Sequence, residues 1–247
     1  MLEKIEGIVI KTKDYGETNK IVTIFSINLG KFSAVAKGAK KPKSRMAAVT
    51  QPFILGQFLI YPSKGLGSVQ SGDILDSFRK IREDIVKTAY AAFAAELTDK
   101  LLENQDPDPY MYDQFVRTMH WISDEADADI PIMMYELKLY QKAGFAPVVD
   151  RCVHCGRTEG LTAFSVAEGG VLCRSCAGGN EDTVVLSEKL IRLLAIFAST
   201  GLERVGKISM KPENIRLIRQ LLDAYYDQYG GYYLKSRKFL SQLDLLK

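Results

Sequence analysis

The chain has 247 residues, of which 47% are hydrophobic, 26% are charged and only two are histidine. This composition excludes a wholly disordered or fibrous protein, and no uninterrupted apolar stretch approaches the roughly 20 residues that span a bilayer. The acidic N-terminus does not resemble a secretory signal, so we expect a cytoplasmic protein. Two histidines are too few for a three-histidine metal site, and they disfavour histidine-based acid–base chemistry.

The formal net charge of +3 is distributed unevenly along the chain. Residues 1–80 carry 13 basic and 6 acidic side chains, residues 81–150 carry 6 and 14, and residues 151–247 carry 14 and 10. This asymmetry indicates that the first block meets a polyanion and that the acidic block faces water or a protein partner. The alternative is a set of solvated faces with no partner.

The first 80 residues predict about five strands, because short runs rich in Ile, Val, Phe and Thr alternate with turn-forming residues. Five short strands without a long helical pattern are typical of an oligonucleotide-binding (OB) barrel. An SH3-like barrel has a similar strand count, and the pattern does not choose between the two. The expected strands are residues 5–11, 19–27, 31–37, 53–61 and 67–77.

A basic segment at residues 37–45, here called the basic loop, places five cations within nine residues. Gly38 and Pro42 disfavour regular structure there, so we expect a mobile loop that follows a phosphate backbone without reading bases. Nearby aromatic rings include candidates for base stacking, although a small barrel needs most of them in its core. The predicted phosphate ligands are Lys37, Lys40, Lys41, Lys43 and Arg45, flanked by Lys11, Lys13, Lys20 and Lys31. The aromatic candidates are Tyr15, Phe25, Phe32, Phe53, Phe58 and Tyr61.

The rest of the chain is predicted to be mainly helical. Apolar residues recur at helical spacing from Tyr90 to Leu101, and further helices are expected around residues 115–122 and 132–143. Ser187 and Pro212 are expected to begin two later helices, and a last basic helix follows Gly231. Its three charges are expected to form an ordinary solvated face. An acidic segment lies at residues 124–129, and we expect the single Trp121 to anchor the core.

All four cysteines of the chain fall in one C-x2-C-x17-C-x2-C pattern. Two such turns separated by 15–20 residues present four thiolates tetrahedrally, so Cys152, Cys155, Cys173 and Cys176 predict one structural Zn²⁺ in a ribbon. Disulfides, a redox C-x2-C and an iron–sulfur cluster are the alternatives, and each fits the spacing or the expected compartment less well. His154 is a possible substitute ligand, but we expect it outside the metal shell. Four protein ligands would leave no open position for catalysis.

No nucleotide-binding, metalloprotease or hydrolase motif occurs, and no pair of carboxylates stands out as an acid and a base. We therefore expect a binding protein rather than an enzyme.

The order of these parts resembles the RecO family of bacterial DNA repair proteins, over nearly the whole chain. The segments that carry the resemblance are residues 6–10 (EGIVI), 14–20 (DYGETNK), 36–45 (AKGAKKPKSR), 51–53 (QPF), 144–147 (GFAP), 164–165 (FS), 169–170 (GG) and 234–240 (LKSRKFL), with the four cysteines and Gly156.

This resemblance implies an α+β multidomain protein. Its N-terminal domain, residues 1–80, is a five-stranded OB-fold barrel, and an all-helical domain at residues 81–247 contains a four-cysteine zinc ribbon at about residues 150–183. The resemblance further implies binding of single- and double-stranded DNA and annealing of complementary strands. The implied partners are RecR, the C-terminal tail of single-stranded DNA-binding protein and, indirectly, the recombinase RecA, in the cytoplasm at the nucleoid. No short motif places the pocket for that tail, and neither Lys138 nor Lys142 is assigned to it.

Two other functions fit the residues. One is a zinc-ribbon scaffold that docks proteins while the basic loop only solvates the barrel. The other is an RNA-binding accessory factor, which differs in its preference for a 2′-hydroxyl and which sequence does not distinguish.

Overall fold

The computed structural model describes residues 1–125, 127–178, 183–206 and 208–244. Part of the acidic segment at 124–129 and of the predicted ribbon at 150–183 therefore lies outside the described residues. By internal packing the chain forms two compact units. Unit 1 contains residues 1–128 and 234–247, and unit 2 contains residues 129–233. The predicted domains 1–80 and 81–247 stay a prediction, because the two units follow another division.

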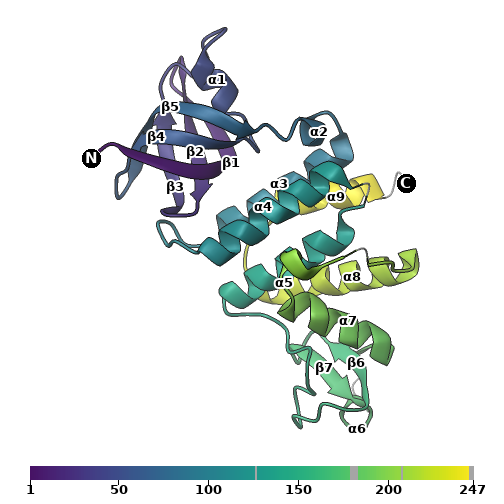
Figure 1. Ribbon diagram of the computed structural model, residues 1–247. Helices are drawn as coiled ribbons and strands as arrows, with labels where there is room; N and C mark the ends of the chain where they lie inside the picture. The colour runs from purple at the N-terminus through teal and green to yellow at the C-terminus, as the bar shows by residue number, and fades with distance from the viewer. Residues whose placement is uncertain (126, 179–182, 207, 245–247) are drawn as a thin grey trace. The chain divides into compact units, whose positions relative to one another are not determined.

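Unit 1 begins with a closed five-stranded barrel in the order β1-β2-β3-β5-β4 (Figure 1). All strand pairs are antiparallel except β3 with β5, which run parallel from Ser33↔Leu66 to Ala36↔Val69. This parallel closure with a short helix between β3 and β4 identifies the OB-type barrel, which the strand count alone did not. The strands are β1 (Glu3–Tyr15), β2 (Asn19–Ser26), β3 (Gly30–Ala36), β4 (Leu55–Tyr61) and β5 (Leu66–Asp76).

The barrel is held by apolar side chains that point inward from alternate positions of the strands, while helices cover some of the outward-facing positions. Val22, Ile24, Phe58 and Ile60 are fully buried in one cluster inside the barrel. Burying aliphatic and aromatic side chains of this size contributes about 1.5–3 kcal/mol each, which explains why Ile, Val and Phe dominate these strands.

Three longer helices complete unit 1: α3 (Ile85–Leu101), α4 (Pro109–Asp124) and α9 (Lys235–Asp244). The Asp84 carboxylate caps α3 by accepting from the N–H groups of Val86 and Lys87, and the Asp108 carboxylate caps α4 by accepting from the Met111 N–H. α9 lies beside α3, although the two are far apart in sequence (Figure 1). The short helices are α1 (Arg45–Val49) and α2 (Arg79–Arg82).

Unit 2 packs α5 (Asp129–Lys142) against α7 (Glu188–Ser199), the 3₁₀ turn η1 (Leu202–Arg204) and α8 (Pro212–Tyr229). The predicted starts are confirmed, because the Ser187 hydroxyl accepts from the Leu190 N–H and Pro212 is the first residue of α8. Trp121 in α4 of unit 1, by contrast, is only partly buried, so the prediction of a core anchor was wrong.

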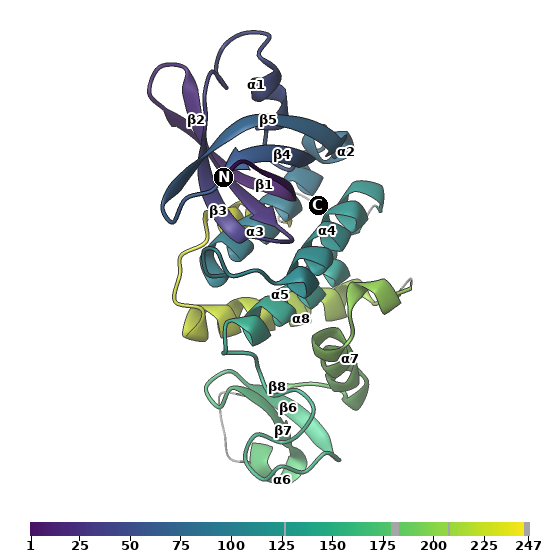
Figure 2. The same ribbon diagram turned by 60° about the vertical axis from the view of Figure 1, so that its left-hand side comes forward.

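The ribbon of unit 2 is a three-stranded sheet in the order β7-β6-β8 (Figure 2). Its strands are β6 (Leu161–Ser165), β7 (Gly170–Cys173) and β8 (Thr183–Val185), with the short helix α6 (Arg174–Ala177) after β7. None of the helices in the described parts of the chain has the length and apolar character needed to cross a membrane.

Candidate nucleic-acid interface and metal centre

The basic loop is anchored to the turn between β1 and β2, at one end of the barrel. The Lys40 N–H donates to the Thr18 carbonyl (2.9 Å), and the Gly38 N–H donates to the Asn19 side-chain oxygen (3.0 Å). Figure 2 shows this loop, which leads into α1, and the β1–β2 hairpin at the same end of the barrel. The loop thus has a defined path of consecutive turns, and its last predicted residue, Arg45, begins α1.

Most charges of the basic loop point to solvent. Lys37, Lys41, Lys43 and Arg45 are exposed, and none of these four forms an ion pair with another described residue. Lys40 pairs with Asp14 across 3.0 Å, which draws the loop toward the hairpin. Exposed cationic groups without carboxylate partners are available to bind the phosphates of a nucleic-acid backbone.

Of the four flanking lysines, three remain at the surface. Lys13 is exposed, Lys20 is half-buried, and Lys11 is 56% exposed although its ammonium lies 2.7 Å from the Asp99 carboxylate. The contact of these lysines with DNA stays a prediction.

Lys31 is a correction to the sequence-based set. Its side chain is only 7% exposed, and its ammonium donates to the Asp99 carbonyl and lies 3.8 Å from the Asp99 carboxylate. Burial lowers the pKa of Lys31, and Asp99 partly restores it. The residue therefore joins β3 to α3 inside unit 1 and is not placed to contact phosphate.

The candidate stacking rings divide sharply by burial. Phe25, Phe32, Phe53 and Phe58 are buried, whereas Tyr15 and Tyr61 are each 48% exposed. Phe25 packs edge-on against Tyr112 and Phe115 of α4. The expectation that most of these rings fill the core is confirmed.

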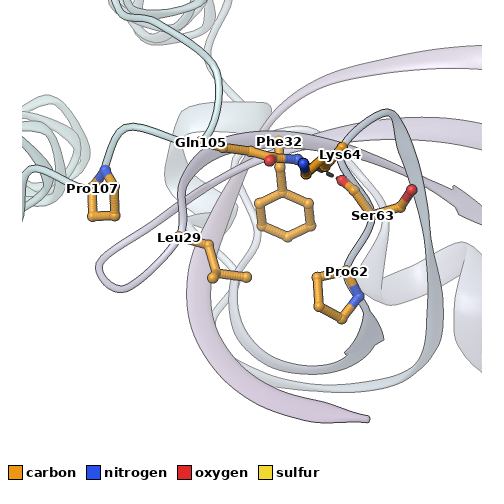
Figure 3. Close-up of a pocket in the computed structure, with 7 residues that line it drawn as sticks. All are labelled: Leu29, Phe32, Pro62, Ser63, Lys64, Gln105 and Pro107. Carbon is orange, nitrogen blue, oxygen red and sulfur yellow. Dashed lines mark hydrogen bonds between the residues drawn. The ribbon is translucent and has the colours of Figure 1, made fainter. Parts of the chain in front are cut away.

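A pocket of about 330 Å³ lies at the opposite end of the barrel (Figure 3). The Phe32 ring faces its centre between Leu29 and Pro62, and the Gln105 amide donates to the Ser63 carbonyl across it. Gln105 has φ +57°, and its N–H donates to the Lys31 carbonyl (2.8 Å), so the α3–α4 connection is held against the barrel here. Lys64 and Pro107 complete the lining. No part of the sequence analysis pointed to this pocket.

The four cysteines of unit 2 converge on one point. Their sulfur atoms lie within 4.8 Å of one another, and the Cys155 and Cys173 sulfurs are 3.7 Å apart. Zn–S bonds of about 2.3 Å in a tetrahedron place sulfurs about 3.8 Å apart, so the donor set fits a tetrahedral ion. Tight turns bring the thiols together, since the Gly156 N–H donates to the Cys152 carbonyl and the Cys152 N–H to the Arg157 carbonyl, each at 2.8 Å.

Backbone donors favour thiolates at this cluster. Burial raises the pKa of Cys152, but N–H groups of Cys155, Cys173 and His154 bring it down to about 6. The N–H of Cys176 lowers the pKa of Cys173, whereas hydrogen bonds with Cys173 and Cys155 raise that of the Cys176 thiol to about 12. Four sulfurs this close carry four negative charges only with a cation between them, so the cluster is suited to a thiophilic metal ion.

His154 stands outside this set of sulfurs. Its Nε2 atom lies 2.8 Å from the Glu168 carboxylate, and both side chains are partly exposed. The four cysteines can therefore fill a tetrahedral site without it.

Sequence reasoning missed two buried charges in unit 2. Lys138 of α5 donates to the carbonyls of Phe197 (3.1 Å) and Met134 (3.4 Å), and burial lowers its pKa to about 8. Glu136, also buried, accepts from Arg219 and from the Tyr140 hydroxyl, each at 2.7 Å. Charged residues at helical core positions were a signal, because lysine and glutamate are almost never fully buried without a polar partner.

An OB-type barrel with a cationic loop, followed by helices and a four-cysteine ribbon, defines a class of multidomain proteins with a cysteine cluster that could hold a metal ion. Two family models match the chain: "Recombination protein O N terminal" over residues 1–78 and "Recombination protein O C terminal" over residues 82–238. The chain belongs to the RecO family of DNA repair proteins. This membership confirms the resemblance found in the sequence.

Curated relatives agree over almost the full length. The DNA repair protein RecO of Oceanobacillus iheyensis is 61% identical over 244 residues, which are 99% of this chain and 95% of that protein. RecO of Bacillus pumilus is 44% identical over 247 residues, covering 100% of this chain and 96% of the relative. RecO of Bacillus cytotoxicus is 46% identical over 244 residues, covering 99% and 98%.

Proposed function

We propose that this protein acts in DNA repair as a recombination mediator that binds single- and double-stranded DNA through the basic end of its barrel. The observation that carries the proposal is the exposed cationic cluster of the basic loop, four of whose five cations have no ion-pair partner among the described residues. Hydrogen bonds to Thr18 and Asn19 hold this loop at the end of the barrel. Such a cluster gains affinity by releasing the counterions of phosphates, and it requires no particular base sequence.

We propose strand annealing as its action. Two complementary strands repel each other, and lysines that neutralise both backbones lower this repulsion while leaving the base edges accessible for pairing. Binding and positioning are sufficient for this process, so the proposed function requires no catalytic residue.

We propose that Cys152, Cys155, Cys173 and Cys176 hold one Zn²⁺. Four thiolates favour zinc over harder ions, and a closed set of four protein ligands is typical of structural sites. The metal would hold the two cysteine turns together and stabilise the ribbon.

Family membership supports partners for this function. We propose RecR and the C-terminal tail of single-stranded DNA-binding protein as direct partners. RecA is an indirect partner, because the protein would assist its loading onto the coated strand. The site for the tail stays unassigned.

An annealing assay tests this function. Two complementary strands with donor and acceptor dyes are mixed with the wild-type protein or with a variant in which Lys37, Lys40, Lys41 and Lys43 are Ala. We expect wild-type protein to accelerate pairing and the variant to lose most of this effect while its thermal unfolding is unchanged. No acceleration by either protein would instead support the zinc-ribbon scaffold, and equal acceleration by both would place annealing outside the basic loop. Acceleration confined to RNA strands would support an RNA-binding accessory factor.

A further inference from the structure

Tyr15 is a half-exposed ring at the basic end of the barrel, in the segment 14–19 whose other side chains are polar or charged. It ends β1 and is paired with Asn19, whose side chain also accepts from the Gly38 N–H of the basic loop. The Tyr15 side chain forms no hydrogen bond and no ring contact with another described residue, and 48% of the residue's surface is exposed. Among the described residues, no ring contact or side-chain hydrogen bond accounts for an aromatic residue at this position.

The strand geometry places Tyr15 in line with two lysines. Side chains alternate between the faces of a strand, so Lys11, Lys13 and Tyr15 share the outer face of the β1–β2 hairpin. The basic loop lies alongside the hairpin, next to β2, because Lys20 pairs with Ala36 at the end of β3 and Lys40 donates to Thr18. The exposed ring thus shares its strand face with Lys13 and lies at the same end of the barrel as the basic loop, whose Lys40 is paired with Asp14 beside the ring in sequence.

This combination is what single-strand binding requires. Cations hold the phosphates, and an aromatic face stacks on a base of any type, because every base has a π-face. A duplex already uses both faces of its bases for internal stacking and offers a ring no such contact. We propose that Tyr15 stacks on one unpaired base of a strand whose phosphates lie on the basic loop, so that this end of the barrel prefers single-stranded over double-stranded DNA. The inference rests on the DNA-binding function proposed above.

Tyr61 supplies a matched control within the same barrel. It is the same residue type with the same 48% exposure, and it likewise has no hydrogen bond or ring contact with another described residue. It ends β4 at the opposite end of the barrel, next to Pro62 of the pocket in Figure 3. A strand bound at the basic loop would stack on Tyr15 and not on Tyr61.

The test measures the affinity for a mixed-sequence single strand and for the corresponding duplex at fixed salt. We expect Tyr15→Ala and Tyr15→Leu to weaken single-strand binding about five- to thirty-fold, and duplex binding less than two-fold. Tyr15→Phe keeps the aromatic face and should bind as wild type. Tyr61→Ala should also bind as wild type.

The salt dependence separates stacking from charge. Tyr15→Ala should keep the wild-type slope of log K against log salt, because no phosphate contact is lost, whereas Ala at the loop lysines should reduce the slope. A single strand carrying a photoreactive iodouracil should cross-link to the peptide that contains Tyr15.

Several results would overturn the inference. Unchanged single-strand affinity in Tyr15→Ala, an equal loss for duplex, or the same loss in Tyr61→Ala would each do so. If Tyr15→Ala is unstable, then the comparison of Tyr15→Leu with Tyr15→Phe decides the question. The loop variant separates the two proposals: if it loses DNA while Tyr15→Ala does not, stacking fails and the DNA-binding function stands. If wild type binds no DNA, both fail.

Discussion

The cysteine cluster and the basic loop are both places where like charges gather, but the chain builds them differently. In the cluster, two tight turns and a short sheet bring four sulfurs within 4.8 Å, so the residue spacing already determines the site. In the loop, the charged groups stay apart in solvent, and the tertiary structure determines which lysines are exposed and therefore able to contact a phosphate. A chelating site can thus be inferred from spacing, whereas a polyanion-binding surface requires the fold.

The largest effect is expected from breaking the cluster. Cys152→Ser, or removal of the metal by a chelator, should unfold the ribbon, because structural zinc contributes about 10–16 kcal/mol of apparent binding free energy in zinc-finger peptides. Hydrogen exchange should show lost protection at residues 148–178, and metal analysis should fall from one zinc per chain to none.

His154→Ala is the matched control, since this side chain pairs with Glu168 outside the sulfur set. Full zinc content and full protection are expected. Loss of metal in this variant would mean that the histidine is a ligand.

The next effect concerns Lys138, whose charge is buried in unit 2. Its pKa is about 8 in the folded protein against 10.5 unperturbed, so below pH 8 the folded state carries a charge that it disfavours. Between pH 8 and 10.5 the folded state releases this proton first, and stability should rise with pH by about 3 kcal/mol from this group. Lys138→Met should remove that rise, measured by urea unfolding at pH 7 and pH 10.

Lys189→Met changes an exposed lysine of α7 and serves as the control. It should keep the wild-type dependence on pH. An undiminished rise in Lys138→Met would show that Lys138 is not the group responsible.

A smaller effect on stability and on DNA binding should distinguish the buried Lys31 of the barrel from the exposed lysines of the basic loop. Lys31→Ala leaves Asp99 with Lys11 as its remaining ion-pair partner, and should cost about 1–2 kcal/mol of unfolding free energy without changing the salt slope of DNA binding. Lys37→Ala should do the opposite, with a stability change within about 0.5 kcal/mol and a slope reduced by about 0.7. A reduced slope in Lys31→Ala would return this residue to the DNA interface.

Particular residues show how far the sequence was informative. The five strands and the convergence of the four cysteines could be predicted, because alternation and spacing are local properties of the chain. The choice of an OB-type barrel required the parallel pairing of β3 with β5, which is non-local. The Lys31 side chain points into unit 1 because it pairs with Asp99, which lies in a helix far along the chain. No local sequence pattern could have indicated this contact.

The exposed rings illustrate the same limit. Tyr61 and Phe25 both lie in predicted strands, 53–61 and 19–27, yet one is half-exposed and the other is fully buried under α4. Only the packing of helices on the barrel distinguishes them.

The central claim is that the basic end of the barrel contacts phosphate. Its most direct test is the salt dependence of single-strand binding by Lys41→Ala/Lys43→Ala, compared with Lys4→Ala/Lys64→Ala, which removes two exposed lysines from the opposite end of the barrel. We predict that the first pair lowers the slope by about 1.4 and weakens binding to all sequences alike, while the second leaves the slope unchanged. Equal slopes for the two pairs, or a loss that depends on base sequence, would contradict this assignment.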